Sequence, residues 1–154
     1  MGQSLERREQ DLSILRLMYA VSLRIGDEMQ RLSEARLSHV EILALSLINT
    51  SPGLSQSDLG TGLNRSPVYV SRMVDELEKA DLVERRPHKL DRRRKVLHLS
   101  EEGQALFQKM RDRAIELAAE VFRETPAERL KIMSVQSKRI ADRLHLVTAG
   151  RFVA

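Results

Sequence analysis

The fold is decided by the stretch SPVYVSRMVDELEKADLVERRPHKLDRRRKVLHL, residues 66–99. Its first part predicts an amphipathic helix, because apolar residues recur at i, i+3, i+4 and i+7 and therefore share one buried face. These residues are Val70, Met73, Val74 and Leu77. Ser66 is a favourable N-cap, and Pro67 suits the first helical position because its missing N–H needs no partner there.

The outward face of this helix carries Val68 and Arg72, flanked by Tyr69 and Ser71. Its first two turns contain no acidic residue, whereas the third turn contains Asp75, Glu76 and Glu78. A phosphate backbone would repel that acidic end. Only the N-terminal half of the helix is therefore suited to enter a DNA groove.

A short hairpin with a basic turn is predicted to follow. Residues 82–86 lead to Pro87, and residues 95–99 alternate in polarity as a half-buried strand does. The turn between them sets a single acid, Asp91, against the basic residues Lys89, Arg92, Arg93 and Arg94. Arginine suits the narrow, strongly negative minor groove, and Asp91 can hold Arg93 because residues two apart in an extended chain point to the same side. The hairpin is typical of a wing that probes DNA.

The order and spacing of four segments resemble the MarR family of bacterial winged-helix transcription regulators. The segments are VSRMVDELE at 70–78, LVER at 82–85, DRR at 91–93 and LSEEG at 99–103. The resemblance covers most of the chain, because the family also has one long helix before this core and two after it. It implies a homodimer with interlocked first and last helices, repression of transcription and relief by a small molecule. It also implies that Arg93 is the wing-tip arginine and that Asp91 is its partner. The chain departs from the family at Gly60, where the family more often has alanine.

Capping patterns predict where the other helices begin. Ser38 with Glu41, and Ser55 with Asp58, have the spacing of a capping box. The helix after Ser55 stops near Gly62 and joins the residue-66 helix through a tight turn, which is the arrangement of a helix-turn-helix. Ser100 is expected to cap a long helix, and Thr125 followed by Pro126, as N-cap and first helical residue, is expected to start the last one.

The N-terminal segment, residues 5–36, is compatible with one long helix. Its apolar residues recur at near-heptad spacing and are Ile14, Met18, Val21, Ile25, Met29 and Leu32. Such a helix packs either against a second chain or in the core of its own, and the sequence leaves both open. We expect a mainly α fold with a small β-hairpin wing, divided into an N-terminal dimerisation helix (1–36), a winged helix-turn-helix region (37–100) and C-terminal dimerisation helices (101–154), interlocked as one domain.

Composition restricts the function further. The 154 residues carry a net charge of +4, and the basic residues between Arg85 and Lys95 concentrate positive charge on one face. Aromatic residues make up only 3%, which argues against a surface that stacks single-stranded bases. The chain has no cysteine, which excludes disulfides and thiolate metal sites. Because no signal peptide or membrane-spanning run is visible, we expect a cytoplasmic protein.

Catalysis and metal binding find little support. His39 and Glu41 are too close along a helix to share one face, and His88, His98 and His145 lack ligand spacing. The sequence has no glycine-rich phosphate loop and no nucleophile motif. We expect no metal, no cofactor and no enzymatic activity, and a metal-dependent enzyme is the remotest alternative.

These observations predict a sequence-specific regulator that binds double-stranded DNA as a homodimer. The candidate contacts are Gln56, Ser57, Arg65, Ser66, Val68, Tyr69, Ser71, Arg72, Asp91, Arg92, Arg93 and Arg94. Twofold symmetry implies a pseudo-palindromic site with half-sites roughly 10 base pairs apart. Alternatively, Arg72 pairs with the acids of its own helix, Val68 and Tyr69 pack on the hairpin, and the basic turn is merely solvated. A non-specific architectural DNA binder and a helical protein-interaction module are the alternative functions.

Overall fold

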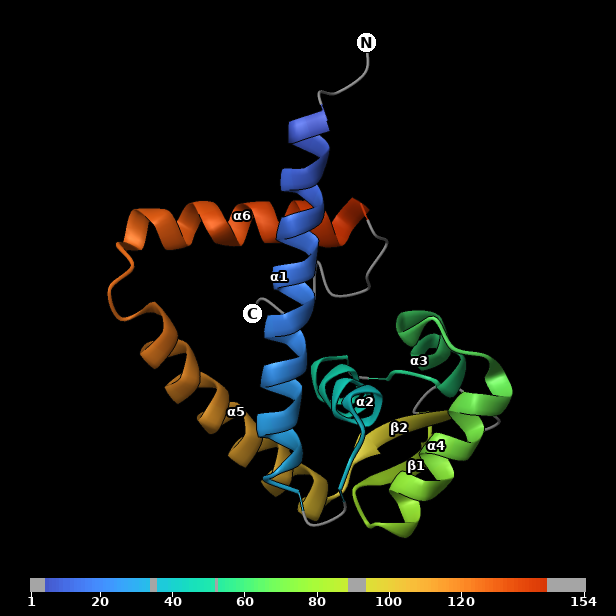
Figure 1. The fold of residues 1–154 in the computed structure, drawn as a ribbon. Coiled ribbons are helices and arrows are strands. Elements are labelled where there is room, and N and C mark those ends of the chain that lie inside the picture. Colours follow the sequence, from blue (N-terminus) through green and yellow to red (C-terminus); the bar gives the residue numbers. More distant parts are fainter. Residues whose placement is uncertain (1–4, 34–35, 52, 89–93, 144–154) are drawn as a thin grey trace.

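The computed structural model describes residues 5–33, 36–51, 53–88 and 94–143 and is mostly helical (Figure 1). Its elements are α1 (Leu5–Gln30), α2 (His39–Thr50), α3 (Gln56–Leu63), α4 (Pro67–Lys79), β1 (Val83–Pro87), β2 (Lys95–Leu99), α5 (Glu101–Phe122) and α6 (Ala127–Arg143). The two strands pair as an antiparallel hairpin. The predicted fold class, mainly helical with a small hairpin wing, is confirmed.

The predicted caps start α2 and α3. The Ser38 hydroxyl accepts the Glu41 N–H at 3.3 Å, and the Glu41 carboxylate accepts the Ser38 N–H at 2.7 Å. Ser55 and Asp58 repeat this reciprocal pair at 3.2 and 3.1 Å. Each box satisfies two backbone donors that a helix N-terminus otherwise leaves without a partner. Both helices therefore begin at the residues that the sequence indicates.

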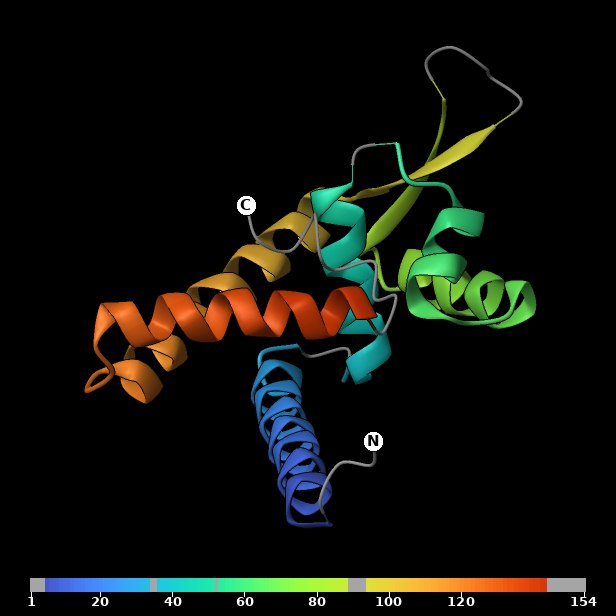
Figure 2. The same cartoon turned by 90° about the horizontal axis from the view of Figure 1, so that it is seen from above.

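The hydrophobic core lies where α2, α3, α4, the hairpin and the N-terminal half of α5 meet. The largest fully buried side chains are Leu45, Leu47, Leu59, Leu77, Leu97, Val70 and Val74. The hairpin is anchored to the rest of the fold at the middle of β2, because the Leu97 N–H donates to the Leu54 carbonyl at 2.8 Å. From there the two strands extend away from the helices, as Figure 2 shows. A rigid core thus carries both α4 and the hairpin.

The N-terminus of α5 approaches the end of α4 very closely. The Leu82 carbonyl accepts the Ser100 N–H at 3.2 Å, and the Ser100 hydroxyl accepts the Gly103 N–H at 2.9 Å and donates to the Asp81 carbonyl. A Cβ atom on Gly103 would lie 2.0 Å from the Leu82 carbonyl oxygen. Only glycine permits this approach, which gives a physical reason for the glycine of the LSEEG segment.

Two parts of the chain project beyond the core. Most of α1 extends away from it, and α5 and α6 form a V whose apex lies near residue 124 (Figures 1 and 2). Met29 is the buried residue of α1, whereas α6 has none. The interpretation of residues 5–36 as an ordinary core helix is therefore wrong for most of α1 within one chain.

Some predicted boundaries differ from the structure. The first helix ends at Gln30 rather than Arg36, because the Gln30 amide donates to the Leu37 carbonyl at 2.6 Å and Arg36 has a φ of 49°. Helical periodicity does not reveal this hydrogen bond, which joins a side chain to a carbonyl seven positions further on. The helix α6 starts at Ala127, one residue after the predicted Pro126. Within the described residues, no helix combines the length and apolarity needed to cross a membrane.

Candidate nucleic-acid interface

Helix α4 presents the outward face that its sequence predicts. Its four periodic apolar residues are buried, and the Ser66 hydroxyl caps the helix by accepting the Tyr69 N–H at 3.3 Å. On the other face the Val68 side chain is 80% exposed and Tyr69 42% exposed, and Arg72 is exposed as well. Ser71 is only half-buried. The alternative in which Val68 packs on the hairpin is therefore wrong.

The turn before α4 is fixed by local bonds and carries an ordered cation. Asn64 adopts a left-handed conformation as the C-cap of α3, and the Arg65 N–H donates to the Gly60 carbonyl at 3.0 Å. The Arg65 guanidinium lies 5.7 Å from the centroid of the Tyr69 ring, within the range of a cation–π contact. An open groove at this turn brings together most of the predicted helix-start contacts; it is lined by Gln56, Ser57, Gly60, Thr61, Asn64, Arg65, Ser66 and Pro67.

The hairpin emerges beside α4, and its strands pair in register from Val83 with Leu99 to Pro87 with Lys95. Beyond the last pair, the His88 N–H donates to the Arg94 carbonyl at 2.8 Å, so the two arms of the hairpin remain hydrogen-bonded toward the tip. The Arg94 side chain is exposed. Asp91, Arg92 and Arg93, the other predicted wing-tip residues, lie outside the described residues.

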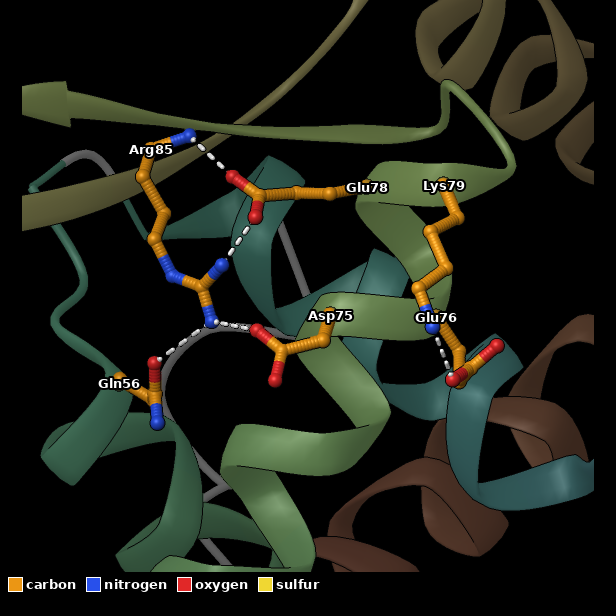
Figure 3. Close-up of polar contacts among 6 residues, drawn as sticks. All are labelled: Gln56, Asp75, Glu76, Glu78, Lys79 and Arg85. Atoms are coloured by element: carbon orange, nitrogen blue, oxygen red, sulfur yellow. Dashed lines mark hydrogen bonds and ion pairs between the residues drawn. The ribbon is translucent and has the colours of Figure 1, made fainter.

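Arg85 belongs to a polar network that the sequence did not reveal (Figure 3). Its Nη2 donates to Asp75 Oδ1 at 2.7 Å and to Gln56 Oε1 at 3.1 Å, and its Nη1 donates to Glu78. The Arg85 backbone N–H also donates to Glu78, at 3.1 Å. The sequence places Arg85 at the start of the basic cluster that concentrates positive charge on one face. In the structure Arg85 does not add to that charge, because two carboxylates neutralise it. The partners lie 7 to 29 positions away, so only tertiary structure brings them together.

The acidic third turn of α4 is also neutralised. Asp75 and Glu78 bind Arg85, and Glu76 accepts a hydrogen bond from the Lys79 ammonium at 2.8 Å, which raises the pKa of Lys79 above its usual value. Each acid that Arg72 could have paired with therefore has another cation within 3 Å. Arg72 remains exposed on the outward face, beside Val68 and Tyr69 in the helical order.

A second surface lies on the projecting helices and is apolar. Its members on α1 are Leu5, Leu12, Ile14, Leu15, Leu17, Met18, Tyr19, Val21, Leu23 and Ile25, and those on α5 and α6 are Ile115, Val121, Phe122, Ile132, Met133 and Val135. Arg113 ties α5 to α1, because its Nε and Nη2 both donate to Glu28 Oε1, at 2.9 and 2.7 Å. The hydrogen bond from Arg113 lowers the pKa of Glu28. A groove of about 850 Å³ between α1, α2 and α5 has a mixed lining, which includes the apolar Met29, Ile42 and Phe107 and the polar Asn49, Gln108 and Arg111.

Comparison with known sequences identifies the winged-helix region. The pattern of the MarR family matches residues 37–95. The HTH-type transcriptional regulator BilQ of Clostridium symbiosum (strain WAL-14163) is 34% identical to this chain over 62 residues. That alignment covers 40% of this chain and 43% of BilQ, so the chain spans less than half the length of this curated relative.

Comparison with solved structures extends the likeness to the projecting helices. A MarR family protein from Bacillus stearothermophilus matches with a TM-score of 0.79 at 14% identity, over 94% of this chain and 99% of the other. FabT from Streptococcus pneumoniae, solved in complex with DNA, matches with a TM-score of 0.76 at 16% identity, over 90% and 97% of the two chains. Such identities show a common fold, here the winged-helix fold with its long flanking helices. The chain thus resembles the MarR family by sequence over its winged-helix region and shares the fold of a MarR family protein over nearly its whole length.

Proposed function

We propose that this chain is a homodimeric, sequence-specific DNA-binding transcription regulator, a repressor of a pseudo-palindromic operator that a small molecule relieves. The observation that carries this proposal is the outward face of α4, whose first two turns are exposed and free of acidic residues next to a projecting hairpin. A helix of this width fits the major groove, and an arginine-tipped hairpin fits the adjacent minor groove. The DNA complex of FabT, a protein of the same fold, supports this assignment.

The proposed contacts divide into three groups by position. Arg72, Val68, Tyr69 and Ser71 would face the major groove from α4. Gln56, Ser57, Arg65 and Ser66 would hold phosphates at the two helix starts, where backbone N–H groups also favour anions. Asp91, Arg92, Arg93 and Arg94 would form the wing tip. Phosphate contacts position the protein on the duplex, and base contacts determine which sequence it selects.

The apolar surface of the projecting helices supports the homodimer. Monomeric proteins rarely expose contiguous apolar patches of more than a few hundred Å², and α1 alone exposes ten large apolar side chains. A second copy that packs its own α1, α5 and α6 on this surface would bury it by twofold symmetry. Residues 1–36 and 101–154 would then be the dimerisation segments, flanking the winged-helix region at 37–100.

The groove between α1, α2 and α5 is the proposed place for a small-molecule effector. It lies where a projecting helix meets the core, so a bound molecule would contact both. Such a ligand weakens DNA binding only if it prefers the dimer geometry that does not fit the operator. Its apolar and polar walls suit an amphipathic molecule.

Selection of bound sequences from a random duplex pool tests the proposal, combined with the salt dependence of binding to the winner and to a scrambled duplex. We expect a pseudo-palindrome to be enriched and the logarithm of affinity to fall steeply with the logarithm of salt concentration, by about 0.9 per phosphate contacted. Tight binding without sequence preference would replace the proposal with an architectural DNA binder. Absence of salt-dependent binding would favour a protein-interaction module.

A further inference from the structure

The Arg85 side chain is held between three elements, although it is a permanent cation near the protein surface. Arg85 lies on β1, and its side chain is only 18% exposed. Its N–H groups donate to Asp75 and Glu78 of α4 and to Gln56 of α3 (Figure 3). The planar guanidinium forks toward these partners from separate nitrogens, which a single ammonium cannot do. The arrangement thus joins hairpin, recognition helix and α3 through one side chain.

The neighbouring residue shows that this placement is specific. Arg86 is 56% exposed and pairs with Glu84, which lies on the same strand. That pair connects nothing outside β1. Likewise, Lys79 and Glu76 pair within one turn of α4. Of these three sets of ion pairs, those of Arg85 are the ones that join the hairpin to the helix.

The position of Arg85 along the strand explains what this tie can do. Residues two apart on a strand share a face, so Arg85 follows Val83 on the side of β1 that faces the core. Val83 is buried and pairs with Leu99, whereas Arg85 pairs with Leu97 one step further toward the tip. Beyond Arg85 the strand is exposed on both residues that remain, Arg86 and Pro87. On β1 the last contact with the helices is therefore polar, whereas β2 keeps the buried side chains Val96 and Leu97. An isolated two-stranded hairpin is only marginally stable in water, so its contacts with the helices determine how it is held.

From this geometry we propose that Arg85 is a positioning residue for DNA recognition: it fixes the wing relative to α4, so that helix and wing meet adjacent grooves together, without itself touching DNA. The inference rests on the proposed function and adds to it a residue that acts through the wing. On this proposal Asp75 and Glu78 of α4 favour DNA binding despite their negative charge, because they hold Arg85 in place.

Substitution of these acids gives effects of opposite sign under the two explanations. If charge alone matters, Asp75→Asn and Glu78→Gln remove negative charge near DNA and tighten binding. If they hold Arg85, each weakens binding to the selected operator, by roughly 5- to 20-fold as judged from coupling within side-chain networks. Affinity for a scrambled duplex would not fall. Glu76→Gln is the matched control, because this acid belongs to the same turn but pairs only within α4, and it should leave operator affinity unchanged or slightly higher.

Arg85→Lys separates geometry from charge. It keeps the positive charge but cannot bridge three partners, so we expect the same loss of operator affinity as in Asp75→Asn. Arg86→Lys, the control on the same strand, should have little effect. If Arg85→Lys binds the operator as tightly as the wild type, the proposal is wrong and Arg85 contributes only charge.

A measurement without DNA keeps this inference distinct from the proposed function. The chain has no cysteine, so Val68→Cys and Lys95→Cys introduce unique sites for spin labels on α4 and on the hairpin. Labelled chains are mixed with an excess of unlabelled chains so that the distance within one chain dominates. We then expect one narrow distance distribution in the otherwise unchanged protein and in Glu76→Gln, and a broader one in Asp75→Asn and Arg85→Lys. An unchanged distribution in both variants would overturn the positioning role even if operator binding is confirmed. If the distribution broadens in these variants but selection from the duplex pool yields no operator, the positioning role of Arg85 is supported and only the proposed function is refuted.

Discussion

Replacement of Gly103 by alanine tests the junction between α5 and the end of α4. The new Cβ would lie 2.0 Å from the Leu82 carbonyl oxygen and 2.9 Å from the carbonyl carbon. An acceptable C···O contact is about 3.3 Å, so the two backbones must separate by about 1.3 Å. The backbone of Leu82 cannot move away easily, because both of its polar groups are bonded: the N–H donates to the Leu77 carbonyl at 2.9 Å and the carbonyl accepts the Ser100 N–H.

The magnitude follows from two opposing effects. Alanine is favoured over glycine inside a helix by about 1 kcal/mol. Overpacking against atoms that cannot move costs about 1 to 3 kcal/mol, and a clash with backbone at this distance belongs at or beyond the upper end. We expect Gly103→Ala to lower the free energy of unfolding by about 2 kcal/mol, which for a chain of this size lowers the Tm by about 4 to 8 °C.

Urea unfolding followed by far-UV circular dichroism, at one fixed protein concentration, measures this change. The control is Gly60→Ala, also in a helix, where the new Cβ would be 3.4 Å from its nearest neighbours, Arg65 O and Val70 Cγ2. That variant should be as stable as the wild type or more stable by up to about 1 kcal/mol. If Gly103→Ala matches Gly60→Ala, the close approach does not determine stability and the reasoning is refuted.

Three further predictions concern the wing, the ion pair between α1 and α5, and the apolar surface. Arg93→Ala should weaken operator binding by on the order of 1 to 3 kcal/mol while sedimentation shows an intact dimer, and unchanged affinity would remove the wing-tip assignment. Because Arg113 lowers the pKa of Glu28, their pair stabilises the fold above the usual carboxyl value of about 4.3 and loses this effect as the pH falls through the lowered pKa. Glu28→Gln should therefore unfold at lower urea than the wild type at neutral pH but not in acid; a difference independent of pH would contradict this. Leu17→Glu places a charge on the exposed apolar face of α1 and should shift sedimentation from dimer toward monomer, whereas an unchanged dimer would place the interface elsewhere.

The parts of the fold that the sequence predicted are those coded locally. Ser38, Ser55, Ser66 and Ser100 cap their helices as expected, because each cap depends on residues within three positions. The apolar periodicity of α4 predicted its buried face for the same reason. These signals describe one element at a time.

What the sequence did not predict depends on contacts that reach beyond a single element. The early end of α1 depends on Gln30 reaching the Leu37 carbonyl, and the inward direction of Arg85 depends on acids and an amide from two other helices. From the sequence alone, Arg85 is grouped with Arg86 and the other basic residues, because its partners on α3 and α4 are known only from the structure. The outward assignments of Val68, Tyr69 and Arg72 agree with their exposure, while their contacts with DNA and the whole wing tip stay predictions.

The tight junction at Gly103 also makes α5 a lever. With 22 residues the helix is about 33 Å long, so a displacement of about 3 Å at the Phe122 end corresponds to a tilt of about 5° at the other. At that other end Gly103 is packed directly against the backbone of Leu82, so the helix cannot tilt there without moving Leu82. Leu82 lies between the end of α4 and the start of β1. A small shift of the projecting helices is thus transmitted to the point where helix and wing diverge.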